Sequence, residues 1–379
     1  MKIIRISTIP ISLNVFCKGL LTELRKEGYE VVAVSSPNKE LEEIAQREGV
    51  RTIAVSMERH ISTIKDLKSL WRLIKVFRKE KPDLVHSITP KAGLLSMIAA
   101  WSCRVPVRLH TFTGLLFPTA SGLKQKILIL TDRITCACAT HIVPEGEGVK
   151  NDLINFHITK KPLRVLGFGN VRGINLKYYN PKLPEVKLEA TKIRKDGIFT
   201  FIFVGRIVRD KGINELVAAF TRFNAEYPDS RLILVGQFEN ELNPINTKTM
   251  TLINNTESII CTGHVDDVRP WLAASDALVF PSYREGFPNV VIEAGAMGLP
   301  SIVTDINGSR EIIIDGKNGL IIPPKDEDKI FETMEYLISN SGERKEMAKN
   351  ARPLIESRFE QGFVQKCLKN YYKEICRKG

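Results

Sequence analysis

Residues 282–300, SYREGFPNVVIEAGAMGLP, contain two carboxylates whose spacing could bring both into one pocket. Glu285 lies just before a predicted helix, and Glu293 lies eight residues later, about two turns, so both can face one side. The backbone amides of residues 287–290 would carry the partial positive charge of a helix N-terminus, which favours a phosphate group. A carboxylate, a row of amides and a second carboxylate therefore predict a site for a phosphate-linked sugar.

The chain around this stretch supplies the elements that would position the glutamates. Apolar runs at 276–280 and 301–304 are typical of short buried strands. Pro288 occupies the place of a first helical residue, and the helix-compatible run 289–297 ends at Gly298. The pattern predicts strand, loop, helix and strand, with the first glutamate in the loop.

A second group of charged residues follows another predicted strand, in the sequence VGRIVRDKG at 204–212. Gly205 ends that strand, and Arg206 and Lys211 lie in the loop after it. A guanidinium pairs with phosphate oxygens in bidentate fashion, and an ammonium adds a mobile point charge. Fixed cations favour a transition state in which a leaving diphosphate gains negative charge. Arg206 and Lys211 are therefore predicted to bind a diphosphate, and Arg209 is predicted to be a bystander.

Four segments of the C-terminal half, taken in order, resemble retaining nucleotide-sugar glycosyltransferases of family 4. They are VGRIVRDKG at 204–212, LVG at 234–236, GHVDDV at 263–268, and a glutamate, seven residues and a glutamate at 285–293. Members of that family have the GT-B fold, an α/β architecture in which two Rossmann-like domains face each other across a cleft. The resemblance implies a hexosyltransferase that retains the anomeric configuration and needs no metal ion or other cofactor, the nucleotide-sugar being a substrate.

The resemblance also implies roles for individual residues. Glu293 would hold the ribose hydroxyls, and the backbone around His264 and Val265 would contact the base. Glu285 would contact the transferred sugar and, with the two basic residues of the 204–212 loop, act in catalysis. The implied donor-binding residues are Arg206, Lys211, Gly236, His264, Val265, Glu285, Gly286, Phe287, Pro288, Asn289 and Glu293.

The N-terminal half would supply the acceptor side, and it departs from the family in two places. Members usually carry a glycine-rich loop after the first strand, whereas residues 8–12 here read TIPIS, so Ser12 is left to offer a hydroxyl at a helix N-terminus. Members also often carry a His-Gly pair, where this chain has Thr113 and Gly114, with His110 three residues earlier. These four residues are candidate acceptor or sugar contacts, and for His110 a structural role is an equal alternative.

Strands and helices alternate through both halves, which predicts parallel sheets with right-handed crossovers and sites at the carboxyl ends of the strands. We expect an N-terminal acceptor domain at 1–170, a linker at 171–197, a donor domain at 198–360, and a C-terminal helix within 361–379 that crosses back to the first domain. Predicted strands are 2–9, 31–36, 51–55, 83–88, 106–112, 140–144, 162–166, 198–204, 231–235, 257–261, 276–280, 301–304 and part of 312–324; predicted helices are 12–28, 38–48, 62–81, 91–102, 122–138, 147–155, 212–226, 243–254, 266–274, 289–297, 326–340, 342–358 and 361–377.

Composition limits the class of protein. The 379 residues are 43% hydrophobic and 26% charged, and no apolar run approaches the ~20 residues needed to span a bilayer. Lys2 and Arg5 precede an apolar segment as in a signal peptide, but Pro10 interrupts it, so a cytoplasmic location is expected. Seven scattered cysteines suit reduced thiols. The Asp-rich turn at 326–328 suits a helix cap better than a metal site, and Cys136–Cys138 lacks a second ligand pair.

Positive charge is concentrated in the first half of the chain. Residues 1–180 contain 28 Lys and Arg against 15 Asp and Glu, whereas the whole chain has a net charge of +12. The segment 62–83 places Leu67, Leu70, Trp71, Ile74 and Phe77 near one helical face, with basic residues around the rest. Such a helix could dock on the anionic inner leaflet of the membrane, although a surface helix of a Rossmann domain looks the same. The run ILIL at 127–130 is expected in a core helix, with an acceptor groove as the alternative.

These features favour a glycosyltransferase that moves a hexose or N-acetylhexosamine from a UDP-sugar to a glycan acceptor linked to undecaprenyl diphosphate. The resemblance is to bacterial enzymes of capsule, O-antigen or lipopolysaccharide synthesis. One alternative is a sugar-nucleotide epimerase with the same two-domain plan. A nucleic-acid-binding protein is a weaker alternative, because the basic half lacks aromatic-basic interleaving or a recognition module, and no nucleic acid is expected as a partner.

Overall fold

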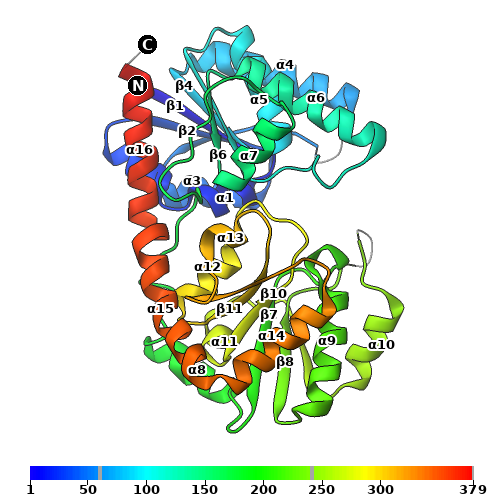
Figure 1. Ribbon diagram of the computed structural model, residues 1–379. Helices are drawn as coiled ribbons and strands as arrows, with labels where there is room; N and C mark the ends of the chain where they lie inside the picture. Colours follow the sequence, from blue (N-terminus) through cyan, green and yellow to red (C-terminus); the bar gives the residue numbers. More distant parts are fainter. Residues whose placement is uncertain (59–61, 240–242, 378–379) are drawn as a thin grey trace. The chain divides into compact units, whose positions relative to one another are not determined.

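A computed structural model describes residues 1–58, 62–239 and 243–377. The chain divides into two compact units, one of Met1–Gly173 with Gly362–Gly379 and one of Ile174–Gln361. Each unit contains one six-stranded sheet whose paired strands are all parallel, with helices around it (Figure 1). The α/β class expected from the alternating pattern is therefore confirmed. Residues 378–379 of the predicted C-terminal segment lie outside the described residues.

The first unit has the strand order β3-β2-β1-β4-β5-β6. Its strands are β1 (Lys2–Ile6), β2 (Glu30–Ser35), β3 (Arg51–Ala54), β4 (Leu84–Ile88), β5 (Val107–Phe112) and β6 (His141–Pro144), and its helices are α1 (Pro10–Cys17), α2 (Leu20–Lys26), α3 (Lys39–Glu48), α4 (Thr63–Glu80), α5 (Pro90–Ser102), α6 (Gly122–Cys138), α7 (Glu147–Asn155) and, from the end of the chain, α16 (Gln361–Arg377). Alternate residues of β1 face opposite sides: Ile4 and Ile6 pack toward α4 and α5, and Ile3 packs toward α1, α2 and α16.

The second unit has the strand order β12-β11-β10-β7-β8-β9. Its strands are β7 (Phe199–Val204), β8 (Ser230–Val235), β9 (Ile259–Gly263), β10 (Ala277–Phe280), β11 (Ser301–Thr304) and β12 (Gly319–Ile322), and its helices are α8 (Pro184–Ile193), the 3₁₀ turn η1 (Arg209–Lys211), α9 (Ile213–Glu226), α10 (Thr247–Asn255), α11 (Arg269–Ala273), α12 (Asn289–Ala296), α13 (Ser309–Ile312), α14 (Glu327–Ser339) and α15 (Ser341–Phe359).

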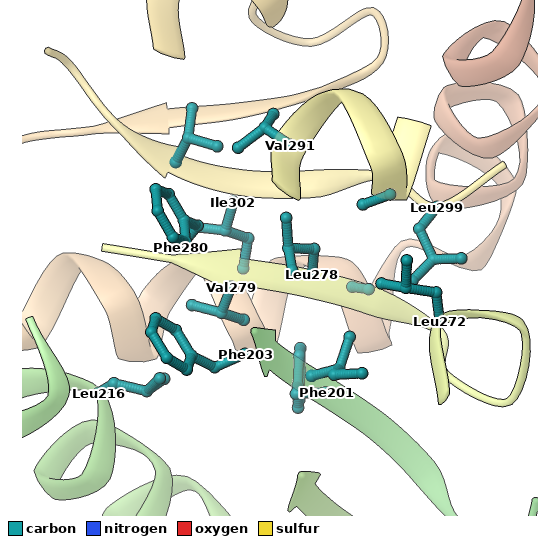
Figure 2. Packing of buried hydrophobic residues seen from close by; sticks show 14 of the residues in the cluster. Phe201, Phe203, Leu216, Leu272, Leu278, Val279, Phe280, Val291, Leu299 and Ile302 are labelled. Carbon is teal, nitrogen blue, oxygen red and sulfur yellow. The ribbon is translucent and has the colours of Figure 1, made fainter. Parts of the chain in front are cut away.

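The central strands of the second unit carry apolar residues on both faces because helices cover both. Phe203 of β7 stacks on Phe280 of β10 with ring centroids 5.9 Å apart, and both are buried. Figure 2 shows Val279 and Phe280 of β10 among the side chains of β7, β11 and the adjoining helices. Burial of such aromatic side chains stabilises a fold by about 2–3 kcal/mol each. The packed core fixes the ends of β7 and β10, from which the loops of the candidate site begin.

Three sequence-based expectations about elements are wrong. Residues 162–166 form no strand, because only Leu163 makes an isolated bridge, to Ile142. The helix expected at 12–28 breaks at Gly19, whose φ of 78° is left-handed. The segment 171–197 is more than a connection, since it contains α8, whose buried residues join the core of the second unit.

The α4 face that the sequence suggested for membrane docking is partly internal. Phe77 lies in the core, and Leu70 and Ile74 pack against it. Leu67 and Trp71 are exposed. The outward face of α4 is therefore narrower than expected, and basic residues adjoin it.

Helix α6 presents an apolar stripe where a core helix was expected. Leu123, Ile127, Leu130 and Ile134 follow one helical face and are exposed, with 74% of Leu123 and 57% of Leu130 accessible. Inside the run 127–130, only the two middle residues pack against the core. Helices α4 and α6 both pack against α5 (Figure 1). Among the residues described, no helix is long and apolar enough to cross a membrane.

Candidate active site

The candidate active site lies in the second unit, at the carboxyl ends of neighbouring strands β7 and β10. This edge of a parallel sheet is where open α/β folds place ligands. The loop after β7 carries Arg206 and leads into η1, which carries Lys211. The loop after β10 carries Ser282 and Glu285. Lys211 and Glu285, which are 74 positions apart in the chain, are thereby brought together.

Two glycines allow these loops to approach each other. Gly212 has a φ of 71°, and a Cβ there would lie 2.1 Å from the carbonyl oxygen of Pro281. Gly236 has a φ of 146°, and a Cβ there would lie 1.9 Å from the carbonyl oxygen of Gly205. No larger residue fits either position without moving backbone. The close contact at Gly212 holds the η1 turn against the loop after β10.

The centre of the site is an ion pair between the ammonium of Lys211 and a carboxylate oxygen of Glu285. The side chains are 19% and 18% exposed, respectively, so the pair is largely shielded from water yet reachable. The hydroxyl of Ser282 donates a hydrogen bond of 2.9 Å to the same oxygen, Glu285 Oε1. The Lys211 ammonium also lies 5.1 Å from the ring centroid of Phe280, within range of a cation–π contact. One carboxylate oxygen is therefore held by two donors, and the sequence analysis did not single out Ser282.

A cavity of about 300 Å³ opens beside this pair. Its lining contains the predicted residues Arg206, Lys211 and Glu285. Residues that the sequence analysis did not assign also line it: Val208, Asp210, Asn243, Ser282 and Arg284. A cavity of this size suits part of a small-molecule substrate. The position of Ser282, directly after a buried strand, was the one sequence signal that could have identified it.

Each cation around the cavity has a carboxylate neighbour. Arg206 pairs with Glu239, and Arg284 lies 3.6 Å from Asp210. Arg206 and Arg284 are more exposed than Lys211. The amide oxygen of Asn243 is buried and has no hydrogen-bond partner among the described residues. The cavity thus combines three cations with polar groups that can contact a ligand.

Helix α12 begins one residue later than expected. Pro288 is the N-cap, not the first helical residue, with an extended conformation (φ −73°, ψ 103°). Because proline has no N–H, the predicted row of amides at 287–290 contains three donors. Glu293 is half-buried on α12 and does not line the 300 Å³ cavity, unlike Glu285. Gly286 and Phe287 bring the loop into α12, and Phe287 packs on Phe359.

The remaining predicted donor residues follow β8 and β9. Gly236 ends β8, and its N–H donates to the carbonyl of Gly263 at 2.9 Å. His264 is exposed, 3.8 Å from Asp266, and Val265 packs partly against the core. These residues do not line the cavity that contains Lys211.

In the first unit, Ser12 lies in the first turn of α1, and Thr113 and Gly114 follow β5. All three are half-buried. His110 is buried: its Nδ1 is 2.8 Å from the hydroxyl of Ser87, and a Cβ on Gly93 would come within 2.4 Å of its ring. Burial lowers the pKa of His110 to about 3, so the ring is neutral. His110 is thus a buried, neutral ring held against Ser87 and Gly93.

Carboxylates and other metal-binding side chains do not gather in the described part of the chain: it contains no group of three or more His, Cys, Asp or Glu that could hold an ion. Asp326 caps α14, its carboxylate accepting from the N–H of Lys329 at 2.9 Å. Asp328 pairs with Arg222. The acidic turn at 326–328 therefore has the capping role expected from its sequence.

Comparisons with known proteins cover both units. Residues 13–169 match a family model described as "Glycosyl transferase 4-like domain", and residues 187–353 match one described as "Glycosyl transferases group 1". The capsular polysaccharide biosynthesis glycosyltransferase CapM of Staphylococcus aureus is 33% identical over 379 residues, covering 100% of this chain and 98% of that protein. A UDP-Gal:alpha-D-GlcNAc-diphosphoundecaprenol alpha-1,3-galactosyltransferase of Escherichia coli is 31% identical, covering 79% and 78%. The solved structure of a glycosyltransferase from Rickettsia africae superposes with a TM-score of 0.82 at 21% identity, covering 100% and 99%.

The chain is therefore an enzyme of the GT-B class, with the fold that the sequence resemblance implied. It belongs to the group 1, family 4-like glycosyltransferases, because a relative more than 30% identical matches it from end to end.

Proposed function

We propose that this glycosyltransferase moves a hexose or N-acetylhexosamine from a UDP-sugar to a glycan acceptor linked to undecaprenyl diphosphate, in the synthesis of a bacterial surface polysaccharide. The observation that carries the proposal is the Lys211–Glu285 pair beside a cavity with Arg206. The name of the Escherichia coli relative supports the donor and acceptor classes, and the name of the Staphylococcus aureus relative supports the pathway.

Lys211 is proposed to hold the diphosphate of the donor. In the reaction, the bond from the anomeric carbon to the diphosphate oxygen breaks, and UDP leaves with the electron pair. An acceptor hydroxyl oxygen forms the new bond to the anomeric carbon, and its proton passes to the departing diphosphate oxygen. The ammonium of Lys211 and the guanidinium of Arg206 would stabilise the charge that grows on the leaving group. The Lys211 ammonium can donate three hydrogen bonds, so it can bind phosphate oxygen while keeping Glu285.

Glu285 is proposed to contact the transferred sugar. Ser282 and Lys211 donate to the same oxygen, Oε1, which orients the carboxylate and leaves Oε2 to accept from sugar hydroxyls. A carboxylate that accepts from two sugar hydroxyls would select among hexoses. Glu293, His264 and Val265 are proposed, as the resemblance implied, to contact the nucleoside. Retention of configuration and independence from divalent metal ions are parts of the same proposal.

Peripheral contact of the first unit with an anionic membrane leaflet is proposed for the acceptor side. The support is the pairing of exposed apolar and basic side chains on α4 and α6. Trp71 and Leu67 of α4 adjoin Lys68, Arg72 and Lys75, and the ammonium of Lys75 lies 3.3 Å from the centroid of the Trp71 ring. Such surfaces bind bilayers through buried apolar area and attraction to anionic lipid.

A direct test measures stabilisation and turnover together. The purified chain is screened against UDP-, GDP-, dTDP- and ADP-sugars, with EDTA present, and with extracted lipid-linked acceptors. Stabilisation by one UDP-sugar, with acceptor-dependent release of UDP in EDTA, is the expected result. Absence of stabilisation by every nucleotide would refute the donor assignment, and loss of turnover in EDTA would refute metal independence. Conversion of donor to an epimer without acceptor would favour the epimerase.

A further inference from the structure

Arg5 is a buried cation without an acidic neighbour. It lies on β1 in the first unit, and its side chain is 3% exposed. It faces the layer formed by α1, α2 and α16, on the same side of the sheet as the apolar residues Ile3 and Leu84. Among the residues that the structure describes, no carboxylate approaches its guanidinium to within ion-pair distance. An unpaired buried charge is costly in proteins, so a counter-charge is expected.

The groups that contact Arg5 are hydrogen-bonding side chains, and none of them is a carboxylate. Its Nη1 donates to the Nδ1 of His86 and, at 2.8 Å, to the hydroxyl of Tyr372 on α16. Its Nη2 lies 3.2 Å from the sulfur of Cys17. Burial, followed by the charge of Arg5, lowers the pKa of His86 well below its ordinary value, and burial raises the pKa of Tyr372 to about 12. Near pH 7 both side chains are uncharged, so the cluster keeps the positive charge of the guanidinium.

Proton positions in this cluster follow from Arg5 being a donor only. His86 Nδ1 accepts from Arg5, so the ring proton lies on Nε2 and is donated to the hydroxyl oxygen of Thr111 at 2.7 Å. The hydroxyl of Tyr372 lies 2.6 Å from the same Nδ1 and shares the single lone pair of that nitrogen with Arg5. The hydroxyl of Thr111 therefore remains available as a hydrogen-bond donor, and no acceptor for it is found among the described residues. The Nε–H of Arg5 is also buried without an acceptor in that part of the chain.

These donors adjoin a small cavity. This cavity, of about 20 Å³, is lined by Arg5, His86 and Thr111 from the sheet. Leu166 and Asn170, which follow α7, and Leu368 of α16 complete the lining. The space suits one water-sized particle and is too small for a phosphate group. Its lining includes a fixed positive charge with an unpartnered N–H on Arg5 and the hydroxyl of Thr111, groups that can bind an anion.

We propose that this cavity binds one small monovalent anion of the halide class, held by the Nε–H of Arg5 and the hydroxyl of Thr111. The anion neutralises the buried guanidinium and accepts both hydrogen bonds. A water molecule would fill the space but leave the charge uncompensated. Because Tyr372 and Leu368 of α16 close the cluster, anion binding also stabilises the attachment of this C-terminal helix to the first unit.

The test uses the full-length protein in potassium gluconate, with gluconate replaced stepwise by bromide at constant ionic strength. The melting temperature should rise with bromide and reach a plateau, by roughly 5 °C when the site is saturated. Thr111→Val, which keeps the shape and removes one donor, should need more bromide to reach that plateau. Arg164→Gln is the matched control: it removes an exposed guanidinium that pairs with Glu374 on α16. It should keep the wild-type bromide response.

A second measurement does not depend on any variant folding. Crystals of the wild-type protein grown in bromide should show an anomalous scattering peak in the cavity beside Arg5. No peak there, or an identical bromide response in wild type and Thr111→Val, would overturn the proposal. An ultraviolet thiolate absorption at pH 7 that disappears in Cys17→Ser would also overturn it, because the sulfur would then supply the counter-charge.

Discussion

Lys211 in the second unit and Arg5 in the first are cations with little exposure beside parallel sheets, yet only Lys211 has a carboxylate partner. The Lys211–Glu285 pair borders a cavity of about 300 Å³, and the Arg5 cluster encloses one of about 20 Å³. A pair beside an open cavity can exchange or share its partner with an incoming anion. A buried cation without a carboxylate partner among the described residues needs its counter-charge in the resting structure. The comparison separates a charge available for substrate from a charge used for stability.

The same contrast extends over the surfaces of the two units. Around the second unit's cavity, Arg206 and Arg284 each have a carboxylate neighbour. On α4 of the first unit, Lys68, Arg72 and Lys75 form no ion pair with any described residue and lie among exposed apolar side chains. Unpaired basic side chains on α4 therefore face solvent, whereas each cation around the second unit's cavity has a carboxylate neighbour.

Removing the ammonium of Lys211 should have the largest effect on activity. Lys211→Ala should lower kcat/KM for glycosyl transfer by about 10²–10³-fold, because the leaving diphosphate loses a fixed cation. Glu285→Gln should have an effect of similar size on transfer while leaving the melting temperature nearly unchanged. Steady-state assays with the donor found in the screen measure both.

Arg209→Ala is the matched control for Lys211, because Arg209 lies in the same 3₁₀ turn and does not line the cavity. It should keep nearly full activity. A Lys211→Ala enzyme that transfers sugar at the wild-type rate would contradict the diphosphate assignment. Equal losses in both variants would mean that only the total charge of the turn matters.

Arg206→Ala should have a smaller effect, roughly 10–30-fold on kcat/KM, because its exposed guanidinium is screened by water and shared with Glu239. Glu239→Gln releases Arg206 from that partner and should tighten donor binding, seen as a lower KM. Unchanged kinetics in Arg206→Ala would restrict the diphosphate contacts to Lys211 and to backbone amides.

The sequence predicted the strand and helix order and the loops that carry Lys211 and Glu285, because the two motifs directly follow apolar strands. It did not predict which apolar residues of α4 and α6 face outward. An apolar run such as ILIL at 127–130 has the same composition in a core and on an exposed stripe, and only packing separates the two. The Arg5 cluster was also missed, since its partners His86 and Tyr372 lie 81 and 367 residues away.

Membrane binding by the first unit should decrease about tenfold when its apolar stripes are made polar. Leu123→Ser combined with Leu130→Ser removes two exposed side chains from α6, and each loses its transfer into the lipid interface. Lys68→Gln with Arg72→Gln should weaken binding to anionic vesicles and leave binding to neutral vesicles unchanged. Cosedimentation with vesicles of defined phosphatidylglycerol content measures both.

Leu188→Ser is the control for this experiment. Leu188 is an exposed leucine on α8 of the second unit, so its substitution changes exposed apolar area outside the proposed docking surface. It should leave vesicle binding unaltered. A decrease as large as that of the α6 variant would show that apolar area anywhere on the chain promotes binding, which would contradict a surface confined to the first unit.

The smallest expected effect concerns a half-buried carboxyl of the first unit. Asp132 on α6 forms no ion pair with the described residues, and burial raises the pKa of its carboxyl to about 7. The folded state therefore binds a proton more tightly than the unfolded state, in which this pKa is near the ordinary 3.8. Stability from this group is full below about pH 4 and is lost as the pH rises toward 7. Asp132→Asn, which is neutral at every pH, should remove this loss and stabilise the protein at pH 8 by about 1 kcal/mol after allowance for partial exposure.

Denaturant unfolding of wild type and Asp132→Asn at pH 5, 6, 7 and 8 measures this difference. The gap between the two free energies of unfolding should widen across that range, because only the wild type must bury a charge as the carboxyl ionises. Asp196→Asn makes the same change of charge at an exposed position of the second unit, so it should give a gap independent of pH. A constant gap for Asp132→Asn would mean that Asp132 is ionised and solvated throughout. Asp132 would then not be a buried charge, and the contrast between the two units would rest on the cations Lys211 and Arg5 alone.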